Sequence, residues 1–185
     1  AKWVTPSRDL ISAFKQEGDE VRFKESIVYY DCNWSNYYPS DNYPFMYKCR
    51  SANSSIIKYR YADVLLLKAE ALIMQDTPDL EGAADIIDEV RDRAKLGALP
   101  TSVRSNKNAM LNALLKERRL ELAFEGQRWF DLVRLDKVEE VMNAVYSKDS
   151  GRKAQIYTFD KNSYRLPIPQ SVIDANDKIH QNPGY

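Results

Sequence analysis

The segment from residue 116 to residue 134 constrains the fold most, because it combines a helical pattern with nine charged residues among nineteen. Its sequence is KERRLELAFEGQRWFDLVR. On a helical wheel, Arg118 and Glu125 fall within an apolar stripe rather than opposite it. A buried charge without a partner is very costly, so we expect both groups to be buried and paired with charges from adjacent helices. The candidate partners are Asp63, Glu70, Arg128, Asp131 and Arg134.

The same helix carries a second apolar side. Leu120 and Phe124 lie opposite the stripe of leucines at positions 111, 114, 115 and 122. An inner helix of a layered array is apolar on two sides because neighbours cover both. The chain offers only two full helical hairpins for this cover. We therefore expect an exposed apolar patch to remain and the chain to be part of a longer protein.

The first helical hairpin is predicted in the middle of the chain. Apolar residues recur at helical spacing from Tyr59 to Met74, and a turn at residues 76–78 leads into a second helix. This second helix is expected to run to about Leu96, with Gly97 as its C-terminal cap. Small alanines stand where the two helices would approach closely. The pair therefore resembles a tetratricopeptide hairpin with a lengthened turn.

A second hairpin is predicted after a polar linker at residues 98–106. Its first helix covers residues 107–125 and ends before Gly126. Its second helix is expected to run from Gln127 to about Tyr146, because apolar residues continue at helical spacing.

The flanking regions are less regular. A short helix is predicted between Pro6 and Gly18, and a short strand within residues 25–31. Residues 33–47 contain two prolines and three asparagines without a helical period, which predicts a long loop. Near the C-terminus, residues 155–159 are a candidate strand, residues 166–169 must be extended, and a short helix begins near residue 171. The predicted fold is mostly α, with tetratricopeptide-like helical hairpins, loop-rich irregular flanks and a few short strands.

The composition excludes several classes of protein. The 185 residues are 44% hydrophobic and 29% charged, as in ordinary globular proteins. Because 27 basic residues balance 27 acidic ones, the chain lacks the positive charge expected of a nucleic-acid-binding protein. No apolar run approaches the length of about 20 residues that a membrane helix needs. The two cysteines, Cys32 and Cys49, could close a disulfide if the protein is exported, and their number alone does not decide this.

The sequence gives little support for catalysis, and we predict that the chain is not an enzyme. The single histidine, His180, is expected to be an exposed tail residue. Glu117, Glu121 and Glu125 are spaced by four residues, which could suggest a pair of glycosidase carboxylates. The neighbouring arginines at positions 118, 119 and 128 favour ion pairs between helices instead. No metal-binding spacing or cofactor motif is recognised.

An aromatic segment is the better candidate for a binding site. Residues 29–47 contain 8 of the 21 aromatic residues of the chain, together with asparagines and no Lys or Arg. Aromatic rings can stack against the C–H faces of pyranose rings, and amides can bind pairs of hydroxyls. We expect an uncharged saccharide to bind here, with Trp34, Tyr37, Tyr38 and Tyr43 as the contact residues. The alternative is that these rings only pack against the core.

Three sequence blocks resemble SusD/RagB-type outer-membrane nutrient-binding lipoproteins. They are YRYADVLLLKAEAL at 59–72, ELAFEGQRWFDLVR at 121–134 and YRLPIPQSVIDANDKIHQNPGY at 164–185. Their order and spacing match the C-terminal part of that family. The resemblance implies a cell-surface protein that captures glycans or peptides for a SusC-like TonB-dependent transporter, and it implies a lipid anchor on an N-terminal segment upstream of this chain.

The resemblance leads us to expect one C-terminal domain or fragment over residues 1–185. Its parts are a helix, a strand and the aromatic loop at 1–58, two helical hairpins at 59–146, and an extended segment at 147–185. The expected partners are an oligosaccharide or other nutrient, the transporter and the missing N-terminal part, without nucleic acid or cofactor. The alternative function is a helical-repeat adaptor that binds a protein partner and has no small-molecule site.

Overall fold

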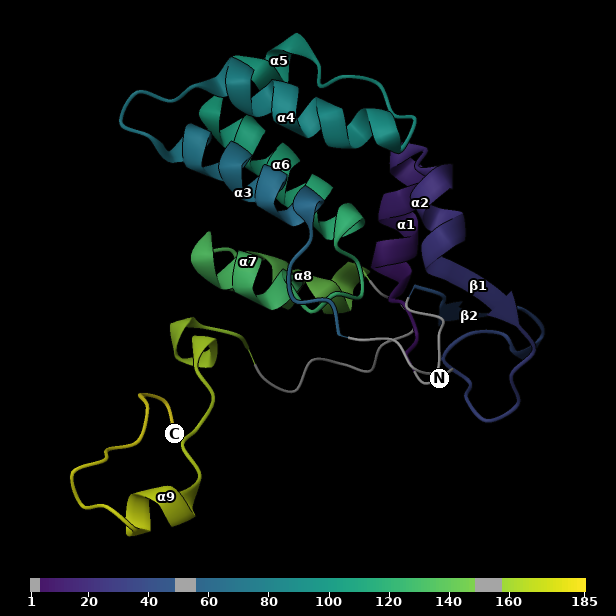
Figure 1. Cartoon of the computed structure of the whole chain (residues 1–185). Helices are drawn as coiled ribbons and strands as arrows, with labels where there is room; N and C mark the ends of the chain where they lie inside the picture. Colours follow the sequence, from purple (N-terminus) through teal and green to yellow (C-terminus); the bar gives the residue numbers. More distant parts are fainter. Residues whose placement is uncertain (1–3, 49–55, 149–157) are drawn as a thin grey trace. The chain divides into compact units, whose positions relative to one another are not determined.

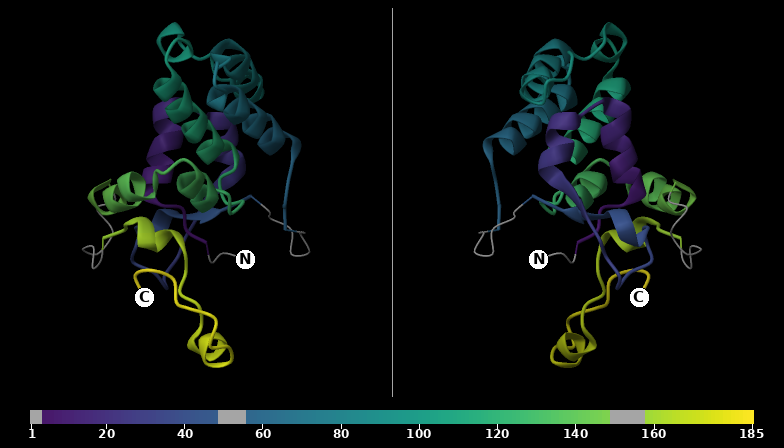
Figure 2. Two further views of the ribbon diagram at one scale, coloured as in Figure 1. Left: turned by 90° about the vertical axis from the view of Figure 1, so that its left-hand side faces the viewer. Right: turned by 90° about the vertical axis from the view of Figure 1, so that its right-hand side faces the viewer.

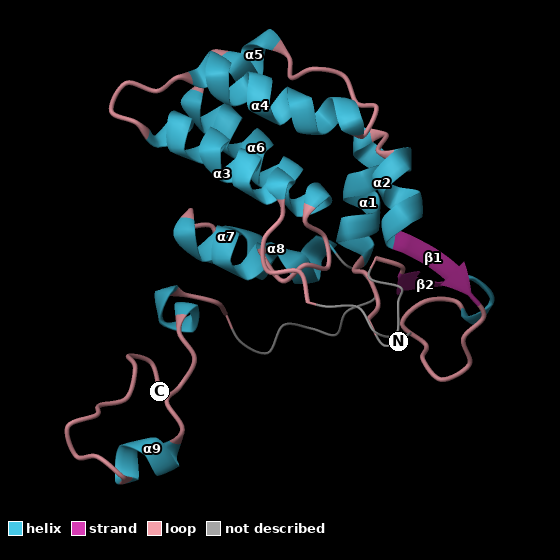
Figure 3. Cartoon of the chain, viewed as in Figure 1, coloured by secondary structure: helices cyan, strands magenta, loops and turns pink. Residues whose placement is uncertain are grey.

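The computed structural model describes residues 4–48, 56–148 and 158–185, which fall into two compact units. The first unit reaches Arg128 and the second begins at Trp129. Helices dominate the described residues, and the described strands are two short ones, which confirms the predicted mostly α fold (Figures 1 and 3). The helices of the first unit are α1 (Arg8–Glu17), α2 (Glu20–Ser26), α3 (Tyr61–Met74), α4 (Leu80–Arg93), α5 (Thr101–Arg104) and α6 (Lys107–Glu121).

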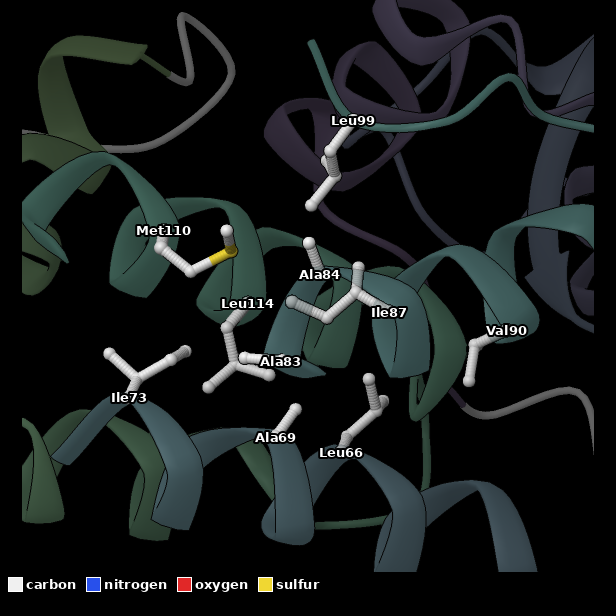
Figure 4. Packing of buried hydrophobic residues seen from close by; sticks show 10 residues of the cluster. All are labelled: Leu66, Ala69, Ile73, Ala83, Ala84, Ile87, Val90, Leu99, Met110 and Leu114. Atoms are coloured by element: carbon white, nitrogen blue, oxygen red, sulfur yellow. The ribbon is translucent and has the colours of Figure 1, made fainter. Parts of the chain in front are cut away.

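The main core lies between α3, α4 and α6, which pack side by side. Figure 4 shows the side chains of this cluster, which are buried. Ala69, Ala83 and Ala84 are completely buried, so the helices can approach closely. The predicted antiparallel hairpin of α3 and α4 is therefore confirmed.

A second cluster lies at the C-terminal end of α6. Leu120 and Ala123 pack with Ile11 and Phe14 of α1 and with Ile27 of the first strand. In Figure 2, α1 and α2 lie together beside α6. The prediction that α6 is apolar on two sides is confirmed, since α3 and α4 cover one side and α1 covers part of the other.

The first helix begins and ends as its caps predict. Ser7 accepts a hydrogen bond from the amide of Leu10, and Gly18 adopts a left-handed conformation with φ of 71°. Helix α2 follows at once and was not predicted. The cap predicted at Gly97 is wrong, because Lys95 takes the left-handed conformation with φ of 61°, two residues after α4 ends.

Three further predictions on this region need correction. The helix predicted over residues 107–125 ends at Glu121, and Phe124 takes a left-handed conformation with φ of 67°. The linker at residues 98–106 contains the short helix α5. The single helix predicted from Gln127 to Tyr146 is instead α7 (Arg128–Arg134) and α8 (Val138–Lys148). The chain breaks between them at Asp136, whose φ of 53° is incompatible with a continuous right-handed helix.

The second unit also contains the short 3₁₀ helix η2 (Lys161–Tyr164) and α9 (Gln170–Asp174). The side chain of Asn143 on α8 forms two hydrogen bonds with the backbone of Phe159. The side chain of Gln181 binds both backbone polar groups of Ile168, which lies in a segment without regular secondary structure. The strand predicted at residues 155–159 lies mostly outside the described residues, as does Cys49.

Helix α3 is apolar on its outer side as well as its inner side. Tyr61, Val64, Leu67 and Met74 recur along this helix and are exposed. These side chains form an exposed apolar row, and its cover by another part of the protein stays a prediction. None of the described helices is both long and apolar enough to cross a membrane.

Candidate ligand-binding site

A small antiparallel hairpin holds the aromatic segment. Strand β1 (Ile27–Tyr30) pairs with β2 (Tyr43–Met46), with Val28 opposite Phe45 and Tyr30 opposite Tyr43. The predicted long loop at residues 33–47 is therefore partly wrong, because its last third is a strand. The connection contains the 3₁₀ turn η1 (Ser40–Asn42), and the amide of Cys32 donates a hydrogen bond of 2.7 Å to the Ser40 carbonyl. This bond closes residues 33–39 into a short loop, which we call the aromatic loop.

Below the aromatic loop lies a layer of buried rings. Tyr43 and Phe45 are each 2% exposed, and their ring centroids are 5.0 Å apart. Trp34 lies against both, at 5.9 Å from Tyr43 and 6.1 Å from Phe45, and yet it stays 55% exposed. Tyr38 meets Tyr43 edge to face at 5.6 Å. The indole of Trp34 is therefore an exposed ring on a rigid aromatic base.

An arginine from α1 reaches the aromatic loop. The guanidinium carbon of Arg8 lies 4.4 Å from the ring centroids of both Tyr37 and Tyr38, within the range of cation–π contacts. The Nη2 group of Arg8 donates a hydrogen bond to the carbonyl of Tyr37. The Tyr38 hydroxyl in turn donates to the carbonyl of Pro6 at 2.9 Å. The start of α1 thus holds the loop from one side.

The surface next to the loop is hollowed. A cavity of about 940 Å³ is lined by the loop and by Arg8. A second cavity, of about 420 Å³, shares Cys32, Asn33 and Ser40 with the first and adds Asp31 and Asp41. The remaining lining residues of the larger cavity are Trp34, Ser35, Asn36, Tyr37, Tyr38 and Pro39. Aromatic, amide and hydroxyl groups therefore converge on one open hollow.

The four residues chosen from the sequence do not occupy equivalent places. Trp34, Tyr37 and Tyr38 line the cavity, whereas Tyr43 lies beneath Trp34 as part of the buried layer. The hydroxyl of Tyr43 is within hydrogen-bonding distance of Ser35, at 2.8 Å. Sequence reasoning missed Arg8, which lies more than twenty residues before the loop and carries no pattern that would link it to the rings.

The hairpin is fixed to the helical core by a cluster of buried charges. Lys48, two residues after β2, lies 2.5 Å from a carboxylate oxygen of Glu125 and donates a 2.7 Å hydrogen bond to the Glu121 carbonyl. Arg60, just before α3, binds the same two residues, with contacts of 2.6 Å to the Glu121 carboxylate and 2.7 Å to that of Glu125. The end of α6 is therefore the anchor for both segments.

Glu121 and Glu117 are the acidic centre of this cluster, and each is 2% exposed. Arg22 of α2 binds Glu117 at 2.6 Å and Glu121 at 3.0 Å, and Arg93 also binds Glu121. Burial raises the pKa of Glu117 above its ordinary value despite Arg22. Burial also opposes ionisation of Glu121, but its hydrogen bonds and charge contacts, led by Arg60, hold its pKa below the ordinary value. Glu121 is therefore the better stabilised carboxylate.

The side chains of Arg118 and Glu125 are buried, as the sequence predicts. Arg118 is 1% exposed, and its Nη1 lies 2.9 Å from a carboxylate oxygen of Asp63 on α3. These two atoms are not aligned for a hydrogen bond, so the contact is an ion pair. The predicted pairing of Arg118 with Asp63 is confirmed. For Glu125 the structure shows Lys48 and Arg60 as partners, and both come from irregular segments outside the predicted set.

The three regularly spaced glutamates form the ion pairs that the sequence favours, since each carboxylate binds at least one cation. His180 is exposed in the C-terminal segment, as predicted. Within the described part of the chain, no group of three or more His, Cys, Asp or Glu side chains could hold a metal ion.

Comparison with known proteins assigns the chain to a family. The model of the SusD family matches residues 41–185. A SusD-like protein of Formosa agariphila is 42% identical over 99 residues, covering 50% of this chain and 19% of the relative. A second SusD-like protein of the same organism is 35% identical over 143 residues, covering 74% of this chain and 27% of the relative. The chain thus spans about a fifth to a quarter of these two relatives.

Solved structures share the fold. A SusD superfamily protein from Bacteroides vulgatus superposes with a TM-score of 0.70 at 22% identity, covering 98% of this chain and 44% of its own. A laminarin-binding SusD-like protein gives a TM-score of 0.62 at 27% identity, covering 96% of this chain and 37% of its own. The family match includes the strand β2 and every helix from α3 onward. The chain therefore belongs to the SusD family.

Proposed function

We propose that the aromatic loop binds a glycan at the cell surface. The observation that carries this proposal is Trp34, a residue that is 55% exposed and lines a hollow of about 940 Å³. An exposed tryptophan supported from below offers a flat apolar platform, and the ring beneath it is already ordered. A stacked sugar would then displace water from both surfaces without requiring the protein to rearrange.

The chemistry around the platform suits a sugar. Asn33, Asn36 and Ser40 line the hollow and supply donors and acceptors for hydroxyl pairs. The volume lies at the upper end of ordinary ligand sites, which favours an oligosaccharide over a single sugar. In this proposal Trp34 and Tyr37 contact the ligand, Tyr38 contributes the edge of its ring, and Tyr43 supports Trp34 from below.

The wider role follows the family. A related SusD-like protein binds laminarin, which supports a glycan rather than a peptide as the ligand. We propose that the full-length protein is displayed on the outer membrane by a lipid anchor and passes its ligand to a SusC-like TonB-dependent transporter. In this role the protein binds its ligand without transforming it.

A glycan-binding screen of the full-length protein tests the proposal, followed by calorimetric titration of the best oligosaccharide. Replacing Trp34 and Tyr37 together with alanine should weaken binding about tenfold or more, since a stacked ring contributes on the order of 1 kcal/mol beyond its buried area. The helical circular dichroism signal should not change. Tyr61→Ala is the matched control, because this tyrosine is 72% exposed on α3 and does not line the hollow.

Unchanged affinity in the double variant would assign the loop to packing and place the glycan site elsewhere in the protein. A loss of affinity in Tyr61→Ala of the same size would show that any exposed aromatic residue affects binding. Either result would overturn the proposed site.

A further inference from the structure

We propose that Arg8 is a positioning residue of this site, which holds the aromatic loop in its binding conformation before ligand arrives. The inference rests on the proposed function and assigns a role that neither the aromatic pattern nor the family match indicates, since the match begins at residue 41. It concerns the contacts that Arg8 makes with Tyr37 and Tyr38.

The backbone of Arg8 is held in place by the packing of α1 against α6. Arg8 is the first residue of α1, directly after the N-cap residue Ser7. Phe14 on this helix packs into the cluster that contains Leu120 of α6. Asp9, the next residue, binds Arg119 of α6 at 2.6 Å. The start of α1 is therefore a fixed point on the helical core.

From this fixed point, the side chain of Arg8 reaches Tyr37 and Tyr38. The rings of Tyr37 and Tyr38 meet at 86° with centroids 4.9 Å apart, and the guanidinium of Arg8 lies 4.4 Å from each centroid. The same guanidinium binds the carbonyl of Tyr37. One side chain thus contacts two neighbouring rings and the backbone between them. A lysine cannot reproduce this arrangement, because its ammonium lacks the planar fork of arginine.

Without these contacts, the aromatic loop should be less ordered before ligand binds. Ordering a residue costs about 1–2 kcal/mol in backbone entropy, so a loop that is disordered before binding pays this cost when it binds. The hydrogen bond from Cys32 to Ser40 closes only the base of the loop. Arg8 acts on the residues just before Ser40, where Tyr37 and Tyr38 lie, so its removal should loosen residues that line the hollow.

A direct contact with an acidic sugar is the competing role, because Arg8 is the only charged residue that lines the larger hollow among the described residues. The two roles predict different results. A positioning residue affects neutral and acidic ligands alike, because both need the ordered loop. A direct charge contact affects only the acidic ligand.

The experiment compares Arg8→Gln and Arg8→Lys with Lys15→Gln in the full-length protein. Lys15 is the matched control, because it is an exposed cation on the same helix that does not line the hollow. Affinities are measured for oligosaccharides of laminarin, which are neutral, and for oligogalacturonate, which is acidic. Hydrogen exchange of residues 33–40 is measured with and without saturating ligand.

We expect both Arg8 variants to bind each ligand that the wild type binds about tenfold more weakly, and Lys15→Gln to bind it normally. Exchange of residues 33–40 should be faster in the free Arg8 variants and should return to the wild-type rate at saturation. A loss that is confined to oligogalacturonate with unchanged exchange would overturn positioning in favour of direct contact. Unchanged affinity would also overturn it.

The two proposals fail separately. If the wild-type protein binds no oligosaccharide at all, the proposed glycan function is wrong. The exchange rates of the free Arg8 variants then still decide the role of Arg8, since unchanged rates would show that it does not order the loop.

Discussion

Neutralising Glu121 on α6 should destabilise the fold strongly. Three cations converge on its carboxylate, namely Arg22, Arg60 and Arg93. The substitution Glu121→Gln keeps the shape of the side chain and removes its charge. It leaves Arg22 with one carboxylate partner fewer in a nearly buried place, where its side chain is only 8% exposed.

The expected loss is about 3–5 kcal/mol of unfolding free energy, the range for removing one partner of a buried ion pair. Arg93 contributes little to this figure, because its side chain is 61% exposed and solvent screens its contact. Most of the loss comes from Arg22 and Arg60. For a chain of this length the loss corresponds to a fall of about 6–20 °C in melting temperature.

The contribution of the Glu121 charge to the unfolding free energy depends on pH in a defined direction. The pKa of Glu121 is lower in the folded chain than in the unfolded chain, so its charge stabilises the fold above the ordinary glutamate pKa. This stabilisation disappears as the pH falls through the lowered folded pKa. The difference between wild type and Glu121→Gln should therefore be largest near pH 7 and should shrink below about pH 4.5.

Glu117→Gln is the matched control, one turn earlier on the same helix. Burial raises the pKa of Glu117, so its ionised form already costs the folded chain free energy, and its neutralisation should cost less. Urea unfolding followed by circular dichroism between pH 3 and pH 8 gives both free energies. Equal losses for the two variants at pH 7, or a loss for Glu121→Gln that does not depend on pH, would refute the reasoning.

Two further predictions concern the helical core and its surface. Arg118→Ala should destabilise the fold by about 3 kcal/mol or more, because it leaves the carboxylate of Asp63 buried without this cation. In urea unfolding, the double variant with Asp63→Asn should lose less unfolding free energy than the sum of the two single variants. Additive losses would argue against the pair. Replacing Val64 and Leu67 on the outer side of α3 with glutamine should reduce the fluorescence of an apolar dye that binds to the 185-residue chain. The stability of the chain should not fall, since both side chains are exposed. Unchanged dye fluorescence would show that this row is not an accessible apolar patch.

The helices were predictable from the sequence where local signals agree. The caps at Ser7 and Gly18 define α1, and helical spacing of apolar residues defines α3 and α4. Helix α2 escaped prediction because it spans seven residues, too few for a clear period. The break at Asp136 escaped because the apolar pattern continues across it and no glycine or proline marks it.

The buried charges were only half predictable. A helical wheel places Arg118 and Glu125 on an apolar face, and this alone requires partners. Which partners they have depends on segments far away in the sequence. Lys48 and Arg60 both bind Glu125, and neither lies in a helix. The sequence pattern of one helix contains no information on where such irregular segments run.

The candidate site was also predictable only in part. The density of rings at residues 29–47 identifies the segment, but it does not separate exposed rings from buried ones. Contacts with Trp34, Tyr38 and Phe45 bury the ring of Tyr43. Its place depends on a strand that contains Pro44, a residue that is rare inside strands. Arg8 enters from another helix, so it was absent from any reading of the loop alone.

The most direct test of glycan binding at the aromatic loop is a crystal structure of the full-length protein with the best-binding oligosaccharide. The account predicts a sugar ring stacked on the exposed face of the Trp34 indole, with hydroxyls bonded to amide groups of the loop. Tyr43 should remain buried beneath it. A saccharide bound at a distance from residues 33–40, with the indole of Trp34 in contact only with solvent, would contradict the account.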